Sequence, residues 1–172
     1  MHDDLIDAVN WAIAEGIADP TRIAICGSSY GGFAAFVGAT FTPDVFCCAI
    51  DLVGPSNLLS FIASVPPYWS IYLAQLHKKV GNPATEPDFL RKRSPLFSVD
   101  KIRIPMLIAQ GANDPRVKQA ESEQIVEEMK QKGIDHEYLL FPDEGHGFAK
   151  PQNRLKFYAA CEEFLARHLR KF

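Results

Sequence analysis

The stretch AICGSSYGGFA, residues 24–34, decides the fold. An apolar run ends in a cluster of small residues, and a helical pattern begins directly after it. Within the cluster, Gly27, Ser29 and Gly31 form the pattern Gly-x-Ser-x-Gly. A sharp turn from a strand into a helix strains the backbone of the central residue and leaves no room for side chains at the flanking glycines. We therefore predict that the hydroxyl of Ser29, the central residue of the pattern, stands above the edge of a sheet, and that Ser28 does not take this position.

Four short apolar runs indicate buried strands, and helical patterns separate them. The strands are expected at residues 22–26, 47–53, 105–111 and 136–141. The helices are expected at residues 3–15, 30–40, 117–132 and 152–169, with an irregular, partly helical segment at 56–98. The runs are continuously apolar instead of alternating, so both faces of the sheet should be covered. The pattern predicts an α/β fold, a mostly parallel sheet flanked by helices, in a single domain over residues 1–172.

An acidic residue and a histidine follow the third and fourth predicted strands. Asp114 lies in QGANDPRV (110–117), and His146 lies in DEGHGF (143–148). Parallel sheets bind their ligands at the carboxyl ends of the strands, where these two residues and Ser29 should meet. A serine hydroxyl needs a base, and the base needs an orienting carboxylate. The chain order of serine, acid and histidine is the order found in hydrolases with this kind of sheet.

The start of the helix after Ser29 suggests a further role for the backbone. Tyr30 is the first residue of that predicted helix, so its backbone N–H has no partner within the helix. An N–H group at a helix N-terminus attracts negative charge. We expect the N–H of Tyr30 to donate a hydrogen bond to the oxyanion that forms when a serine attacks a carbonyl.

Each of these side chains also has an ordinary structural interpretation. Ser29 could lie in a turn that is merely rich in small residues. Asp114 could cap the helix that follows it, and His146 could be a surface histidine. Asp143 and Glu144 compete for the role of the orienting acid, but they are too close to the histidine in sequence to reach its far ring nitrogen. We interpret these two carboxylates as solvated loop charges.

The composition argues against several other classes of protein. A net charge of −3 leaves no basic footprint, so nucleic acid is not an expected partner. No apolar stretch reaches the roughly 18–20 residues that a membrane span needs. The four cysteines, Cys26, Cys47, Cys48 and Cys161, show no zinc-type spacing, and we expect neither a metal nor a cofactor. They are interpreted as small buried hydrophobic side chains in a reducing, cytoplasmic compartment.

The motifs GSSYGGF, QGANDPRV and DEGHGF resemble the catalytic domain of the prolyl oligopeptidase family. The resemblance covers essentially the whole chain and is greatest to acylaminoacyl-peptidase and dipeptidyl-aminopeptidase-like members. It implies the C-terminal part of an α/β-hydrolase fold and a serine peptidase that cleaves short or N-blocked peptides through an acyl-enzyme. It implies Ser29 as nucleophile, His146 as general base and then acid, and Asp114 as its orienting acid. A carboxylesterase or deacetylase of the same fold, and a catalytically inactive fragment, remain alternatives.

The resemblance also implies where a peptide substrate binds. Arg116 is placed to hold a substrate carbonyl on the acyl side of the scissile bond. Trp69, Tyr72 and Val117 fall where the family lines the apolar pocket for the side chain that precedes that bond. Aromatic residues in a stretch such as YWSIY (68–72) can equally pack in the core or in a lid, so this alternative stays open beside the pocket assignment.

Family members carry more strands before the first helix of this sequence, and usually a β-propeller before those strands. We therefore expect these 172 residues to be part of a longer protein. The missing strands would pair beside residues 22–26, and an upstream loop would supply the second oxyanion donor. The expected partners are a peptide or acyl-peptide substrate and this missing segment. The sequence also leaves open whether two copies of the chain form a homodimer.

This expectation predicts that the isolated chain is weakly active or inactive. Loss of one oxyanion donor typically lowers turnover by about 10²–10³. The measurement is the hydrolysis of peptide and ester substrates by the purified monomeric chain. Turnover at normal enzyme rates would show that the chain needs no upstream donor.

Overall fold

A four-stranded parallel sheet with the strand order β1-β2-β3-β4 forms the centre of the protein. A computed structural model describes residues 1–169 of the chain, without the side chain of Pro67. The strands are β1 (Ala24–Ser28), β2 (Cys48–Leu52), β3 (Met106–Gly111) and β4 (His136–Phe141). The predicted α/β fold with a parallel sheet is confirmed, and all six residues of β3 are buried, as a strand covered on both faces requires.

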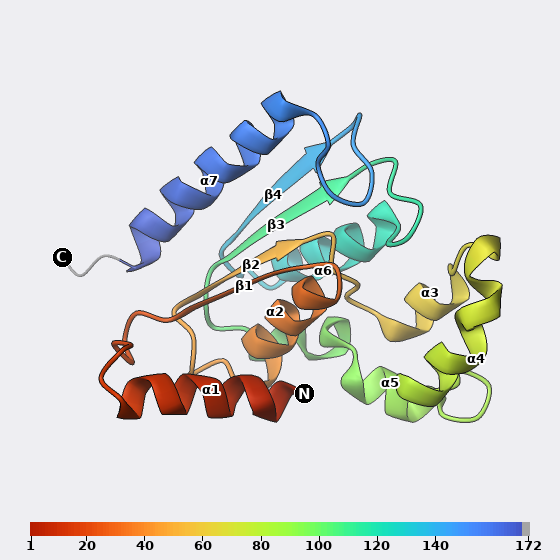
Figure 1. The fold of residues 1–172 in the computed structure, drawn as a ribbon, viewed down its shortest axis with the longest axis horizontal. Coiled ribbons are helices and arrows are strands. Elements are labelled where there is room, and N and C mark those ends of the chain that lie inside the picture. Colours follow the sequence, from red (N-terminus) through yellow and green to blue (C-terminus); the bar gives the residue numbers. More distant parts are fainter. Residues whose placement is uncertain (170–172) are drawn as a thin grey trace.

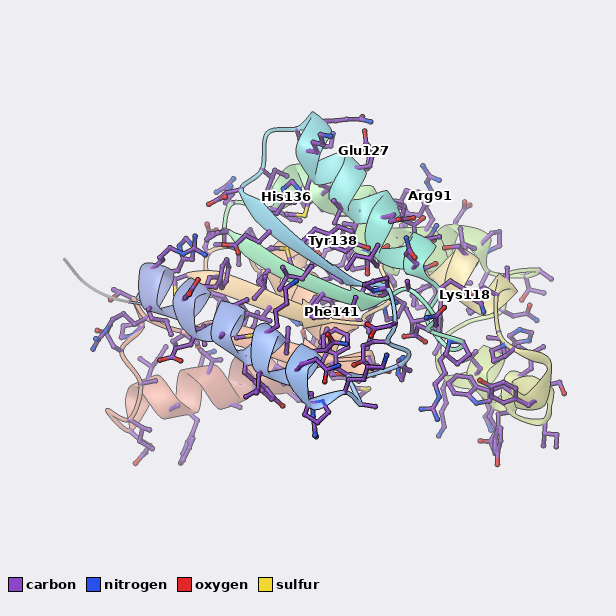
Figure 2. The ribbon with its side chains drawn as sticks, turned by 90° about the horizontal axis from the view of Figure 1, so that it is seen from above. Arg91, Lys118, Glu127, His136, Tyr138 and Phe141 are labelled. Carbon is purple, nitrogen blue, oxygen red and sulfur yellow. The ribbon has the colours of Figure 1, made fainter. Side chains whose placement is uncertain are left out.

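Helices cover both faces of this sheet (Figure 1). The elements are α1 (His2–Ala14), α2 (Tyr30–Phe41), α6 (Gln119–Gln131) and α7 (Pro151–Leu169). Figure 2 shows α6 and α7 on opposite sides of β4, along which His136, Tyr138 and Phe141 are labelled. Among residues 1–169, no helix combines the length and the apolar character needed to cross a membrane.

The sheet separates two apolar clusters, because successive side chains of a strand point to opposite faces. On one face, Ile108 packs in a cluster with Phe36 of α2 and Ile125 of α6. On the other face, Leu107 packs in a cluster with Phe164 of α7. Fully burying a large apolar side chain contributes about 1.5–3 kcal/mol, so these clusters fix the strands and helices on which the loops at the sheet edge are carried.

A helical segment connects β2 to β3, and its first part lies beyond the carboxyl ends of the strands (Figure 1), whereas Val99 near its end packs in the core with Phe36. It contains α3 (Leu58–Ala63), η1 (Pro67–Trp69), α4 (Ser70–Lys79), α5 (Pro87–Arg93) and η2 (Pro95–Lys101). Glu121, a buried residue in the first turn of α6, ties down the start of the segment. Its Oε2 accepts hydrogen bonds from the backbone N–H groups of Ser56 and Asn57, at 3.0 and 2.9 Å. The segment is therefore anchored to the same helix that packs under the sheet.

The element boundaries and the cysteines show where the sequence interpretation was inexact. β1 begins and ends two residues later than predicted, because Gly27 and Ser28 still pair with β2. The prediction that the cysteines are buried is wrong for Cys26, which is exposed because β1 is an edge strand of the sheet. Cys48 is buried, and the other two cysteines are half-buried.

Candidate active site

Ser29 occupies the turn between β1 and α2 with a strained backbone. Its φ is +58° and its ψ is −115°, a conformation that non-glycine residues rarely adopt. Such a conformation costs about 1–3 kcal/mol and persists only where the surroundings impose it. Here the backbone N–H of Ser29 donates to the carbonyl of Leu52 at 2.8 Å, and its carbonyl accepts from the N–H of Phe33 at 3.0 Å. The neighbouring strand and the first helical turn therefore hold the serine in place.

The predicted absence of space for a side chain explains only some of the glycines around Ser29. A Cβ on Gly27 would lie 2.1 Å from the carbonyl oxygen of Gly31, so no side chain fits there. A Cβ on Gly31 itself would meet no atom of the described residues within 4 Å, which contradicts the prediction for this position. The second crowded glycine is Gly32, where a Cβ would lie 2.1 Å from Oδ1 of Asp51.

The structure brings Ser29, His146 and Asp114 together in one hydrogen-bonded chain. The serine Oγ lies 2.8 Å from Nε2 of the histidine, and Nδ1 of the histidine lies 2.7 Å from Oδ2 of the aspartate. The side chain of Asp114 is fully buried, and that of His146 is 13% exposed. An imidazole held in this way can accept the hydroxyl proton while the carboxylate fixes its orientation.

The two carboxylate oxygens of Asp114 serve different parts of the site. Oδ1 accepts hydrogen bonds from the backbone N–H groups of Arg116 and Val117, at 2.8 and 3.0 Å, while Oδ2 faces His146. Asp114 therefore caps the turn that precedes α6. It does not cap the helix itself, whose N-cap is Lys118. Because one oxygen holds its own loop, the other oxygen is presented to the histidine in a fixed position.

The interpretation of Glu144 as a solvated loop charge is wrong. This residue is 3% exposed, so it is not a solvated charge, whereas Asp143 is exposed and pairs with Lys150. Glu144 accepts hydrogen bonds from the N–H groups of Ala149 and Lys150 and from Nδ2 of Asn153, at 2.8–2.9 Å. Burial opposes its charge, but these hydrogen bonds hold its pKa below the ordinary value of 4.5. The side chain of Glu144 thus closes the loop that carries His146.

The loops after β3 and β4 are joined directly to each other. The backbone N–H of Asn113 donates to the carbonyl of Glu144 at 2.9 Å, and its Nδ2 donates to the carbonyl of Pro142 at 2.8 Å. Gly111 permits this crossing, because a Cβ there would lie 2.2 Å from the carbonyl oxygen of Gly145. The loop of the acid and the loop of the histidine therefore form one unit.

A groove of about 900 Å³ opens beside Ser29. The residues assigned to substrate binding from the sequence, Arg116, Trp69, Tyr72 and Val117, all line it. The guanidinium carbon of Arg116 lies 5.8 Å from the ring centroid of Trp69. Most of the exposed lining is apolar. The groove is thus shaped for an apolar group bound next to the serine hydroxyl.

Further lining residues were not identified from the sequence, among them Phe33 and Phe61. A signal for the first existed, since Phe33 lies in the first turn of the helix that begins directly after Ser29. The charged residues that line the groove, Lys79, Arg93 and Arg116, are all cationic. Among residues 1–169, no group of three or more His, Cys, Asp or Glu side chains could hold a metal ion.

Comparisons with known proteins found relatives of this chain in both sequence and fold. The sequence model of the prolyl oligopeptidase family matches residues 1–172. The chain is 56% identical to dipeptidyl aminopeptidase BIII of Pseudoxanthomonas mexicana over 171 residues, 98% of this chain and 25% of that protein. It is 48% identical to dipeptidyl peptidase family member 6 of Caenorhabditis elegans over 168 residues, 96% of this chain and 23% of that protein. The chain thus spans about a quarter of the length of these relatives.

Two solved structures resemble the fold over almost its whole extent. A puromycin-hydrolyzing peptidase of Mycobacterium tuberculosis superposes with a TM-score of 0.92 at 32% identity, covering 98% of this chain and 25% of that one. An acylaminoacyl peptidase in complex with Z-Gly-Gly-Phe-chloromethyl ketone superposes with a TM-score of 0.87 at 28% identity, covering 99% of this chain and 28% of that one.

The hydrogen bonds of Glu144 predict a pH-dependent contribution to stability. Because the pKa of Glu144 is lowered in the folded state, its stabilising effect is fully present above its unfolded value near 4.5 and is lost as the pH falls through the folded pKa. Glu144→Gln should therefore be less stable than the wild type at neutral pH, and the difference should shrink in acid. Urea denaturation at a series of pH values measures this difference.

The matched control for that experiment is Asp143→Asn in the same loop. Asp143 is exposed, and its ion pair with Lys150 is screened by solvent, so this variant should differ little from the wild type and less still at high salt. Equal losses of stability for the two variants would mean that Glu144 has no special structural role.

Proposed function

Because this chain belongs to the prolyl oligopeptidase family, we propose that it carries the catalytic machinery of a serine peptidase. In this proposal Ser29 is the nucleophile, His146 is the general base and then the general acid, and Asp114 orients the imidazole. The observation that supports the proposal most strongly is the continuous chain of hydrogen bonds through the two ring nitrogens, at 2.8 and 2.7 Å.

The proposed reaction begins when Ser29 Oγ attacks the carbonyl carbon of the scissile peptide bond. Nε2 of His146 takes the hydroxyl proton, and the buried carboxylate of Asp114 stabilises the imidazolium that forms. The backbone N–H of Tyr30 donates a hydrogen bond to the oxyanion. The imidazolium then gives its proton to the leaving amine, and a water molecule hydrolyses the acyl-enzyme by the same route in reverse.

The proposed substrates are short or N-blocked peptides with a bulky apolar residue on the acyl side of the cleaved bond. The groove beside Ser29 supports this, because aromatic side chains such as Trp69, Tyr72 and Phe33 line it. Its charged lining is cationic, which disfavours a Lys or Arg side chain there. The acylaminoacyl peptidase compared above binds a blocked peptide that ends in Phe-chloromethyl ketone. Arg116 is proposed to hold a substrate carbonyl on the acyl side.

A second candidate function is hydrolysis of carboxylic esters. The same three side chains attack an ester carbonyl, and the apolar groove accepts an acyl chain as readily as an amino-acid side chain. Aminoacyl-nitroanilides and short-chain nitrophenyl esters, compared on the same preparation, separate the two. Strong ester turnover without amide cleavage would favour the esterase, and cleavage of a Phe-nitroanilide in preference to a Lys-nitroanilide would support the peptidase.

The adjacent serines provide the test of the proposed nucleophile. Ser29→Ala should abolish labelling by a fluorophosphonate and lower kcat by on the order of 10⁶. Ser28→Ala is the matched control, because Ser28 is the last residue of β1 and lies outside the hydrogen-bonded chain. It should keep labelling. The measurement is gel-based detection of the probe on the protein that carries this sequence at its full length. Labelling that survives in Ser29→Ala would rule out this nucleophile.

A further inference from the structure

We propose that Asp51 is a positioning residue, whose buried carboxyl group supports both the first turn of α2 and the turn after β2 and so sets the position of Ser29 Oγ. The inference rests on the proposed function, since it concerns the turn that carries the proposed nucleophile. None of the contacts described above joins Asp51 to His146 or to the groove.

Asp51 lies directly behind the nucleophile turn. It is fully buried in β2, where it pairs in register with Gly27 of β1. The next residue, Leu52, supplies the carbonyl that accepts the hydrogen bond from Ser29 N–H. Oδ1 of Asp51 accepts a hydrogen bond from the backbone N–H of Gly54 at 2.9 Å. The carboxyl group thus closes the turn that follows β2.

The same carboxyl oxygen packs against two backbones that also touch each other. A Cβ on Gly32 would lie 2.1 Å from Asp51 Oδ1, and a Cβ on Gly54 would lie 2.2 Å from it. The Cβ on Gly54 would also lie 2.6 Å from the carbonyl carbon of Gly32. The first turn of α2 and the turn after β2 therefore pack backbone to backbone, with this oxygen atom against both. Removing the oxygen leaves a gap beside this contact, into which either turn can shift.

The turn after β2 carries a second strained residue of the site. Val53 is buried and has φ +50°, which is an outlier for a β-branched side chain. Its N–H donates to the carbonyl of Ala109 at 2.9 Å, and the Asp51–Gly54 hydrogen bond closes the turn around it. Directly afterwards the chain lines the groove with Pro55. A shift of this turn would therefore move both the nucleophile helix and the wall of the groove.

The surroundings of Asp51 disfavour a negative charge. Burial raises the pKa of Asp51 well above its ordinary value of 3.8, and the hydrogen bond from Gly54 opposes this only in part. Among the described residues, Oδ2 has no hydrogen-bond partner. Asparagine reproduces the shape of this carboxyl group and keeps an oxygen acceptor for Gly54 without a charge.

The experiment compares two substitutions at this position in the full-length protein. Asp51→Ala removes this support, and a displacement of the first turn of α2 on the order of 1 Å should lower kcat by about 10²-fold with little change in KM. Asp51→Asn keeps the acceptor for Gly54 and should keep kcat within about tenfold of the wild type. Both are assayed well below the unfolding temperature, with the rate of fluorophosphonate labelling as a second readout.

A remote truncation separates positioning from general stability. Met129→Ala opens the buried core in the last turns of α6, away from the loops of the site, and should leave kcat unchanged at the same temperature. An equal fall of kcat in this variant and in Asp51→Ala, or in Asp51→Asn and Asp51→Ala, would overturn the inference. If Asp51→Ala does not fold, Asp51→Ser replaces it, and undiminished kcat in that variant overturns the inference as well.

The inference can fail separately from the proposed function. If the wild-type protein is not labelled at Ser29, the proposed function fails. A crystal structure of the folded Asp51 variant then decides the inference on geometry alone. Ser29 Oγ remaining 2.8 Å from Nε2 of His146 would overturn it, and a displaced first turn of α2 would support it.

Discussion

The left-handed backbone of Ser29 is the constraint on which the rest of the site depends. At φ +58° the residue turns the chain sharply from β1 into α2, and its hydroxyl then reaches the histidine instead of the core. The strain is offset by close backbone packing, which glycines at positions 27 and 32 permit. The hydrophobic clusters on both faces of the sheet hold β1, β2 and α2 in place, so the backbone of Ser29 cannot move to a conformation of lower energy.

The parallel sheet explains why three distant stretches of sequence meet. Parallel strands end at the same edge, so the loops after β1, β3 and β4 converge there. Convergence alone leaves the loops free to move, and the hydrogen bonds of Asn113 and Glu144 remove that freedom. Asp114 adds its own restraint by bonding two N–H groups of its loop. The distances to His146 therefore depend on the hydrogen bonds that hold the loop backbones as well as on the three side chains themselves.

The sequence was sufficient for the fold because continuous apolar runs and helical patterns are local signals. The glycine pattern around Ser29 and the chain order of the acid and the histidine likewise needed no coordinates. Burial of Glu144 could not be predicted, because its partners lie up to nine residues away in a loop whose path the sequence does not define. The exposure of Cys26 could have been predicted, because the strands expected beside residues 22–26 imply that β1 is an edge strand among the described residues. The crowding of Gly32, like the burial of Glu144, could not be predicted, because the crowding atom belongs to Asp51 of β2, which is distant from Gly32 in the sequence.

The buried carboxyl groups of Glu144 and Asp51 differ in how far the protein favours their charged form, because they differ in their donors. Glu144 has three donors, which hold its pKa below the ordinary value despite burial, so it keeps a negative charge on the loop of His146. Asp51 has one donor, and burial raises its pKa well above the ordinary value, so its surroundings beneath the first turn of α2 disfavour an anion. Hydrogen-bond donors, and not burial alone, thus decide which of the two carboxyl groups is stabilised as an anion.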